Sequence, residues 1–433
     1  MMNIRYGIAL ILLLLVCPVL ARAEELCYVP SLAVREEYNS NIMMDTAAYN
    51  VRKDFATIVS PGLQITDKSE RLDSQLSLRL DRHQFSNEKD LNATDQSAHG
   101  SVQYAETESL KLSAAAGYDK YHYPNLDVTT TALPTPGTVV APPGPPSTTP
   151  PPPPPNTTSI DLVAVRLERI TSSIAADYRW TELTALRGAY QYDWTSYDRP
   201  LYRSTSHDVK AGLVTDLSEY LPRMKGRLNT GYSEYLLPES KTVNVPVTVG
   251  FSYDFNERWS ILADGGMRRT DSEIFVSEVP YTSTSFLVVA DRRKSSEWGR
   301  IGDVALDYRS ASGGAELIYT QDLTLPTGVR AASQRDEVAF SAWFRFTSEI
   351  SASLKTDYSM YRSDDAYSSF IVRQNNASLS TAIRYEFARD LALEASYQFI
   401  KVDFKASGAK ADQQVYFIRL TARFPSCSSS QYK

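Results

Sequence analysis

Few residues in this 433-residue chain have the chemistry of a catalytic acid or base. The four histidines are His83, His99, His122 and His207. Asp81 and His83 are two positions apart, so on a β-strand both side chains lie on one face and can form a hydrogen-bonded pair. His207 and Asp208 are adjacent and would point to opposite faces of a strand, so they cannot form a dyad within it.

A hydrolytic site also needs a positioned nucleophile and donors that stabilise an oxyanion, and no motif in the sequence marks either. The histidines and cysteines do not have the clustered spacing of a metal site. No glycine-rich phosphate loop or cofactor motif occurs. We therefore interpret Asp81 and His83 as part of a strand wall, and we expect a protein that is not an enzyme and uses no metal or cofactor.

A regular alternation of apolar and polar side chains predicts the elements that position these residues. In the last such segment, one face has Tyr416, Ile418, Leu420, Ala422 and Phe424, and the other has Gln413, Arg419, Thr421 and Arg423. Strand side chains alternate with a period of two, so a sheet with this pattern has one apolar and one polar face. A closed barrel with lipid outside and water inside accommodates both faces and leaves no unpaired edge.

Segments of this kind recur along the chain, separated by turns rich in Gly, Asp, Asn and Ser. They predict an all-β transmembrane antiparallel barrel of about eighteen strands, an even number as in bacterial single-chain barrels. The predicted strands lie near residues 28–40, 54–68, 70–85, 96–108, 110–123, 160–181, 183–197, 205–218, 222–236, 241–257, 259–273, 296–311, 314–324, 335–348, 350–363, 376–389, 391–404 and 412–425.

The predicted connections alternate in length, which supports a barrel independently. Tight turns occur at residues 68–69, 106–109, 181–183, 256–258, 313–314, 348–349 and 388–390. Longer polar segments lie between them, at 41–53, 86–95, 124–159, 198–204, 274–295, 325–334, 364–375 and 405–411. Outer-membrane barrels have this alternation of short periplasmic turns and longer extracellular loops.

The N-terminal residues are predicted to be a signal peptide. Arg5 precedes an apolar run over 8–20, and Ala21-Arg22-Ala23 fits a cleavage site, so we assign 1–23 to the signal and 24–433 to one barrel domain. Cleavage removes two arginines and no acid, which changes the net charge from −6 to −8. No later run of 18 apolar residues occurs, which excludes membrane-spanning helices. The absence of a basic stripe argues against nucleic-acid binding.

Two cysteines, Cys27 and Cys427, remain after the predicted cleavage. Cys27 lies just before the first predicted strand and Cys427 just after the last, and those two strands are neighbours in a closed barrel. Both positions face the periplasm when the strand number is even, and the periplasm is oxidising. We therefore predict a Cys27–Cys427 disulfide. The alternative is two free thiols whose Cα atoms stay more than about 7 Å apart.

The polar faces of the predicted strands define candidate lumen-lining residues. The principal candidates are Arg79, Asp81, Arg187, Asp193, Arg345, Arg384, Arg419 and Arg423. Opposite charges on neighbouring strands pair with each other, so this mixture of signs implies no steep charge selectivity. Polar groups together with Tyr and Trp, among them Trp343, would let a hydrated sugar chain slide, although the simpler interpretation of each charge is that it braces the wall.

Two of the predicted loops have unusual compositions. Residues 133–155 contain 12 of the 23 prolines, which favour extended polyproline II, so 126–158 is predicted to be a proline-rich extracellular loop. A tolerated surface insertion is the simpler interpretation, and contact with a partner or polymer is the alternative. The predicted loop 274–295 contains the apolar run Phe286-Leu287-Val288-Val289, and we expect it to fold inward and narrow the lumen.

Two motifs near the N-terminus resemble those of a known group of proteins. They are Glu37-Tyr38-Asn39-Ser40-Asn41-Ile42 and Asp54-Phe55-Ala56-Thr57-Ile58-Val59-Ser60-Pro61-Gly62-Leu63. The chain resembles the outer-membrane β-barrel proteins associated with the PEP-CTERM/exosortase system, and the related barrels encoded beside exopolysaccharide gene clusters. The resemblance covers the first hairpin by motif and the rest by pattern and length. It implies an outer-membrane location and a role in exopolysaccharide secretion, and it supplies no catalytic residues.

These observations lead to three hypotheses. The first is an outer-membrane channel that takes part in exopolysaccharide secretion, with membrane lipid, the polysaccharide and periplasmic export proteins as partners. The second is a general diffusion porin for small solutes. The third is a closed structural or adhesive barrel whose loops bind an outside partner.

Overall fold

The computed structural model describes residues 26–45, 51–122, 167–197, 203–238, 240–278, 289–324, 333–362, 373–405 and 408–426. The predicted signal peptide (1–23) and the predicted proline-rich loop (126–158) lie outside these ranges. Within them, no helix is long and apolar enough to cross a membrane.

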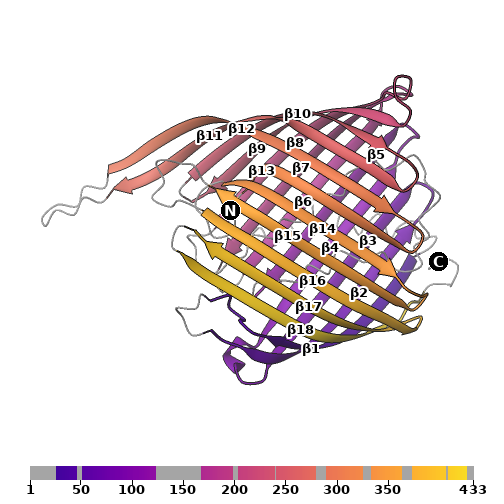
Figure 1. Ribbon diagram of the computed structural model, residues 1–433, viewed down its shortest axis with the longest axis vertical. Coiled ribbons are helices and arrows are strands. Elements are labelled where there is room, and N and C mark those ends of the chain that lie inside the picture. The colour runs from indigo at the N-terminus through magenta and orange to yellow at the C-terminus, as the bar shows by residue number, and fades with distance from the viewer. Residues whose placement is uncertain are drawn as a thin grey trace, which may run out of the picture.

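The described residues form one antiparallel sheet of 18 strands that closes on itself (Figure 1). In chain order the strands are β1 (Leu26–Asn39), β2 (Asp54–Lys68), β3 (Leu72–Phe85), β4 (Ala93–Ala105), β5 (Leu110–Tyr121), β6 (Leu167–Arg179), β7 (Thr184–Tyr197), β8 (Arg203–Asp216), β9 (Met224–Leu237), β10 (Ser240–Asp254), β11 (Trp259–Glu278), β12 (Val289–Arg309), β13 (Gly313–Thr324), β14 (Ser333–Arg345), β15 (Ile350–Arg362), β16 (Arg373–Ala388), β17 (Leu391–Phe404) and β18 (Ala409–Arg423). Each strand pairs with its neighbours in sequence, and β1 pairs with β18. The predicted barrel and its strand number are therefore confirmed.

The two ends of the barrel have connections of different length. Turns of two to seven residues join the strands at one end, and most connections at the other end are longer. The links after β3, β7, β9 and β17 are the exceptions, with seven, five, two and four residues. In outer-membrane barrels the short turns face the periplasm, so the long-loop end is extracellular.

The outer face of the sheet is apolar. On β18, Tyr416, Ile418 and Leu420 are exposed, whereas Val415 and Phe417, which alternate with them, are buried. The same alternation places exposed Val245, Val247, Val249 and Phe251 on one face of β10. An exposed apolar face on a closed sheet is the surface that contacts lipid.

Aromatic rings form two belts on this outer face. Near the short turns, ring pairs are Tyr253–Phe255, Trp259–Tyr308, Phe344–Phe346 and Tyr385–Phe387. Toward the long loops, they are Tyr38–Phe55 and Tyr38–Tyr416, and the pair Tyr397–Tyr416 continues from them at the middle of β17 and β18. Tyr28 and Tyr38 are ten residues apart on β1. At about 3.3 Å per residue and a tilt near 40°, this separation spans roughly 25 Å, the height of an outer-membrane apolar band. The chain is an outer-membrane barrel.

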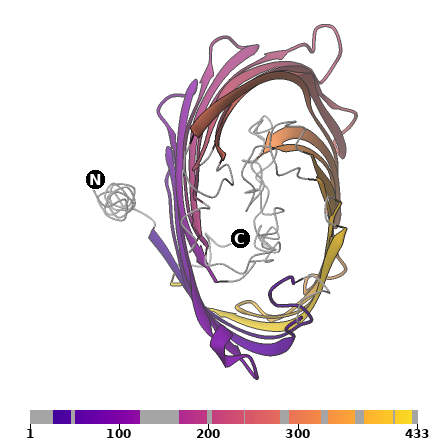
Figure 2. The same cartoon turned by 90° about the vertical axis from the view of Figure 1, so that its left-hand side faces the viewer.

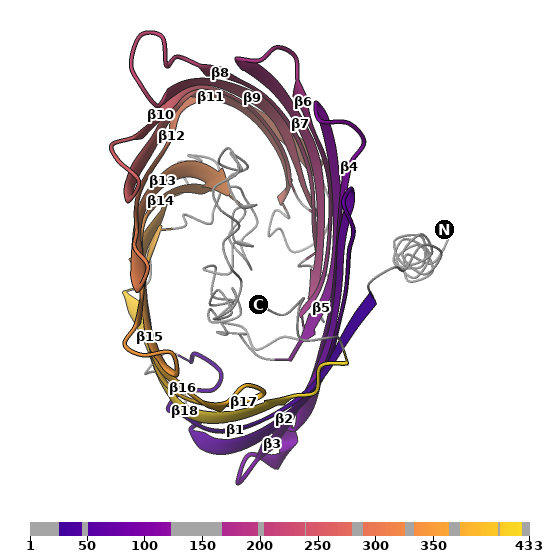
Figure 3. The ribbon, with the colours of Figure 1, turned by 90° about the vertical axis from the view of Figure 1, so that its right-hand side faces the viewer.

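The barrel is elongated in cross-section (Figure 2, Figure 3). Strands β10 and β11 lie at one narrow end (Figure 3), where the two strands approach each other closely. A Cβ atom added to Gly266 would collide with the carbonyl oxygen of Val247, and one added to Gly250 would collide with the backbone of Ala263 and with Asp264. The glycines therefore allow the wall to turn sharply at this end.

The hairpin of β11 and β12 projects beyond the ends of the neighbouring strands (Figure 1). Its register runs unbroken as far as the pair Glu278–Val289. The prediction of one loop over 274–295 was therefore wrong at both ends, because the β-branched and aromatic residues of 274–276 favour a strand. Residues 279–288 lie outside the described part of the chain. They include Phe286, Leu287 and Val288 of the apolar run that was expected to fold inward, while Val289 begins β12.

Candidate functional site

The register places the predicted lumen-lining residues on the inner face. These are Arg79 and Asp81 on β3, Arg187 and Asp193 on β7, Arg345 on β14, Arg384 on β16, and Arg419 and Arg423 on β18. Each alternates along its strand with residues of the outer face. The inner wall is accordingly the part of the barrel that a solute in the lumen would contact.

Most of these charged side chains are paired with an opposite charge on the same wall. The ion pairs are Arg79–Asp81 (2.8 Å), Arg187–Asp177 (3.0 Å), Arg169–Asp193 (3.3 Å), Arg384–Glu386 (3.0 Å) and Arg419–Glu394 (2.8 Å). Some partners are two residues apart on one strand and others lie on the adjacent strand. Because a neighbour of opposite charge neutralises most of these side chains, this part of the wall is polar without a large net charge.

At the seam of the barrel, two arginines share one aromatic ring. Arg35 on β1 and Arg419 on β18 are directly opposite each other. The guanidinium carbons of Arg35 and Arg419 lie 5.1 and 5.7 Å from the ring centroid of buried Phe417. Arg35 also forms an ion pair with Glu37 at 3.1 Å. Cation–π contacts and flanking carboxylates thus offset the repulsion between the two cations.

The opposite imbalance occurs on β11, β12 and β13. On their inner faces Asp264 is directly opposite Asp303, and Asp307 is directly opposite Glu316. Like charges in such positions repel. Arg227 forms an ion pair with Asp264 at 3.2 Å, which relieves part of this repulsion. This part of the wall is therefore the acidic side of the lumen.

Three of the four histidines are also on the lumen wall or at its rim. His83 Nε2 is 3.2 Å from Asp95 Oδ2, and His122 Nδ1 is 2.8 Å from Asp95 Oδ1. His99 Nε2 is 2.9 Å from Asp119 Oδ1. Each of these three histidines thus has a carboxylate partner on the strand wall.

Asp81 and His83 share the inner face of β3, as expected, and each contacts another residue of the wall. Asp81 accepts a hydrogen bond from Arg79, whereas His83 contacts Asp95 on the adjacent strand. The sequence does not reveal the register between β3 and β4, and that register determines the partner. In the described ranges, no group of three or more His, Cys, Asp or Glu side chains could hold a metal ion.

Cys27 is buried on the inner face of β1 and is disulfide-bonded. Its predicted partner, Cys427, lies outside the described residues. The residue before it, Ser426, donates from its backbone N–H and its hydroxyl to the Tyr28 carbonyl, at 2.8 and 3.0 Å. Ser426, which precedes Cys427, is therefore adjacent to Tyr28, which follows Cys27. The Cys27–Cys427 pairing stays a prediction.

The first extracellular connection folds over the rim onto the inner wall. We call residues 40–45 the rim segment. Ile42 packs against Ile58 and Phe85, and Met44 packs against Ile400 and Val402. All four wall residues are on the inner face, so the rim segment covers part of the extracellular mouth from within.

Buried amides hold the rim segment in place. The Gln413 side chain donates to Asn39 Oδ1 at 3.0 Å and to the Asn41 carbonyl at 2.6 Å. The Asn41 side chain donates to the carbonyls of Asp45 and Asp412, at 2.8 and 3.0 Å. Asn39 and Asn41 belong to the first of the two N-terminal motifs, so this motif has a definite structural role here.

Asp54, in the second motif, organises the next extracellular connection. Its carboxylate accepts hydrogen bonds from the backbone N–H groups of Asn87 and Glu88, at 2.7 and 2.9 Å. It also accepts one from the Asn87 side chain at 2.7 Å. Both motifs therefore shape the same sector of the extracellular rim. Sequence reasoning did not assign them this role, although apolar Ile42 and Met44 in a polar connection were an available signal.

No protein-family model and no curated protein matches the chain. Solved structures similar to it include OccAB4 of Acinetobacter baumannii, with a TM-score of 0.42, 10% identity and coverage of 93% of this chain and 99% of that chain. The siderophore receptor PirA of Pseudomonas aeruginosa has a TM-score of 0.42 and 11% identity, and 93% and 81% of the two chains are covered. OpdL of Pseudomonas aeruginosa has a TM-score of 0.40 and 11% identity, and 92% of this chain and 99% of that chain are covered. With similarity this low, the fold assignment depends on the strand order and register of this chain itself.

Proposed function

We propose that this outer-membrane channel takes part in exopolysaccharide secretion. A barrel of 16–18 strands leaves room for an aqueous route, whereas an eight-stranded barrel is filled by its own side chains. The inner wall carries ion pairs on β3, β7, β16 and β18, so hydrated cargo would meet compatible polar groups there.

The observation that supports this proposal best is the pairing of charges on the wall. A polymer touches many places on the wall at once, so strong binding at each of them would stop its movement. Ion pairs such as Arg79–Asp81 and Arg419–Glu394 present hydrogen-bonding groups without a large net charge. Such a surface suits a hydroxyl-rich chain that must bind weakly and move on.

The two N-terminal motifs support the same proposal through their resemblance to barrels encoded beside exopolysaccharide gene clusters. In this chain their residues anchor the rim segment and the connection after β3, where cargo would leave the lumen. A role in secretion would explain why the extracellular mouth is built with buried hydrogen bonds.

Deletion of the gene tests the proposal. We expect exopolysaccharide to fall in the medium and to accumulate in the periplasm, and the gene restored on a plasmid should reverse both changes. Exopolysaccharide at wild-type levels together with slower uptake of small solutes would instead favour the general diffusion porin. The absence of conductance in planar bilayers would favour a closed structural barrel.

A further inference from the structure

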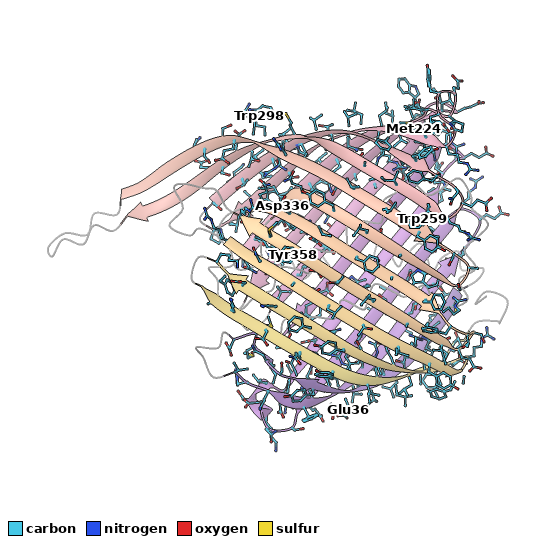
Figure 4. All side chains as sticks on the ribbon, in the orientation of Figure 1. Glu36, Met224, Trp259, Trp298, Asp336 and Tyr358 are labelled. Atoms are coloured by element: carbon cyan, nitrogen blue, oxygen red, sulfur yellow. The ribbon has the colours of Figure 1, made fainter. Side chains whose placement is uncertain are left out.

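One tryptophan, Trp343, is on the inner face of the barrel and not on the outer face that contacts the membrane. The chain has five tryptophans. Trp180, Trp194, Trp259 and Trp298 follow the parity of the outer face, and Trp298 projects from that face in Figure 4. Tryptophan is enriched at membrane interfaces, so these four need no further explanation. Trp343 is on the inner face of β14, close to the short turn that leads to β15.

The wall leaves room for the Trp343 indole. Trp343 is directly opposite Gly314 on β13 and Ser353 on β15. A Cβ atom added to Gly314 would lie 2.8 Å from Nε1 and 3.2 Å from Cε2 of the indole. The pyrrole edge of the ring therefore lies over the Gly314 backbone, in space that any other residue would fill.

Small hydroxyl residues surround this ring on the inner face. Ser341 is two residues before Trp343 on β14, and Ser351 and Ser353 are the neighbouring inner positions of β15. Arg345 is two residues after it, at the end of the strand. The indole is partly exposed, so a ring surface, hydroxyl groups and a guanidinium face the lumen together.

We propose that Trp343 forms a sugar-binding subsite at the periplasmic entrance, with Ser341, Ser353 and Arg345 as its polar border. A pyranose ring has apolar C–H faces and hydroxyl edges. It can stack on an indole while its hydroxyls exchange hydrogen bonds with serine and arginine. The inference rests on the proposed role in polysaccharide secretion and deepens it, because it identifies where the polymer first meets the wall.

Single-channel recording with cellohexaose tests the subsite. Cellohexaose added on the short-turn side of the wild-type barrel should block the current in discrete events. Trp343→Leu should shorten these events at least tenfold, since truncating a tryptophan hot spot costs more than one factor of ten in affinity. Trp343→Phe retains an aromatic ring and should stay within about threefold of wild type.

Two glycine variants test whether block depends on the position of the Trp343 ring as well as on its presence. Gly314→Ala keeps Trp343 but fills the space beneath it, so it should also shorten the events. Gly265→Ala is the matched control, because Gly265 faces outward on β11 and a Cβ atom there meets nothing within 4 Å. Folding of every variant is checked by its heat-dependent mobility on a gel.

If Trp343→Leu leaves the duration of the block events unchanged, the subsite is overturned. A wild-type barrel that conducts ions but is never blocked by cellohexaose would overturn it as well, while leaving the channel intact. A barrel without current would refute the proposed secretion channel instead. In that case, saturation-transfer NMR of cellohexaose with the barrel in detergent tests the subsite. A signal that is present in wild type and lost in Trp343→Leu supports the subsite. The absence of a signal in wild type overturns it.

Discussion

Gly265 and Gly266 are neighbours on β11, but their surroundings are different. Gly266 faces the lumen and packs against the backbone of Val247 and Thr248 on β10, whereas Gly265 faces outward into open space. The two residues have the same type and nearly the same height in the membrane. They therefore form a natural pair for testing whether the narrow end of the barrel depends on close backbone approach.

We expect Gly266→Ala to lower the free energy of unfolding by about 1–3 kcal/mol, because its Cβ atom would force the two backbones apart. Gly265→Ala should change it by less than about 0.5 kcal/mol. Urea titration in detergent micelles, followed by tryptophan fluorescence, measures both values. Equal stability of the two variants would show that the close approach at Val247 is not required.

At the scale of single residues, the sequence predicts faces well and partners poorly. The period-two pattern places Asp81 and His83 on one face, and both are indeed on the inner face of β3. Their contacts with Arg79 and Asp95 depend on rotamers and on the register of β4, which no local pattern encodes. The like-charged pair Asp264–Asp303 depends on register in the same way.

At the scale of elements, the rim segment illustrates how a connection becomes part of the wall. Its apolar residues Ile42 and Met44 pack into two separate clusters on the inner face. Gln413 on β18 is almost fully buried and donates two hydrogen bonds to the segment and its preceding residue. The neighbouring Gln414 points outward and accepts a hydrogen bond from Tyr416.

Gln413→Ala should release the rim segment while leaving the barrel folded. Its loss leaves the Asn39 side chain and the Asn41 carbonyl without this donor, which costs about 1–3 kcal/mol. Hydrogen exchange measured by mass spectrometry should therefore become faster in residues 40–45 of Gln413→Ala and not in Gln414→Ala. Unchanged exchange in the first variant would mean that apolar packing alone holds the segment.

The strands themselves were predictable and one hairpin was not. Alternation over ten or more residues identifies a strand because only a two-sided sheet satisfies it. The ends of β11 and β12 project beyond the neighbouring strands (Figure 1), and the alternation fades there although pairing continues. Conversely, the rim segment was predicted as an ordinary extracellular loop. The alternation of apolar and polar residues identifies strands, and it does not show that a connection packs against the inner wall.

At the scale of the whole molecule, the predicted disulfide joins the two ends of the barrel. Cys27 is disulfide-bonded, and the hydrogen bonds between Tyr28 and Ser426 place the last described residues beside it. A bridge between β1 and the chain after β18 would close nearly the entire barrel sequence into one loop. Such a loop restricts the unfolded chain strongly in the entropic account of disulfides.

We expect reduction of the purified barrel to lower its free energy of unfolding by several kcal/mol, on the order of 5 kcal/mol for so long a loop. Cys27→Ser should have the same effect and should be insensitive to reductant. Peptide mapping under non-reducing conditions identifies the partner. Recovery of Cys427 as a free, alkylated thiol would contradict the predicted pairing.

The elongated cross-section has a geometrical consequence for anything that crosses the barrel (Figure 2). Strand number and strand tilt together fix the perimeter, and for a given perimeter a circle encloses the largest area. Flattening therefore narrows the bore along one axis and widens it along the other. The minor axis therefore sets the upper limit on the thickness of any object that could pass through the barrel.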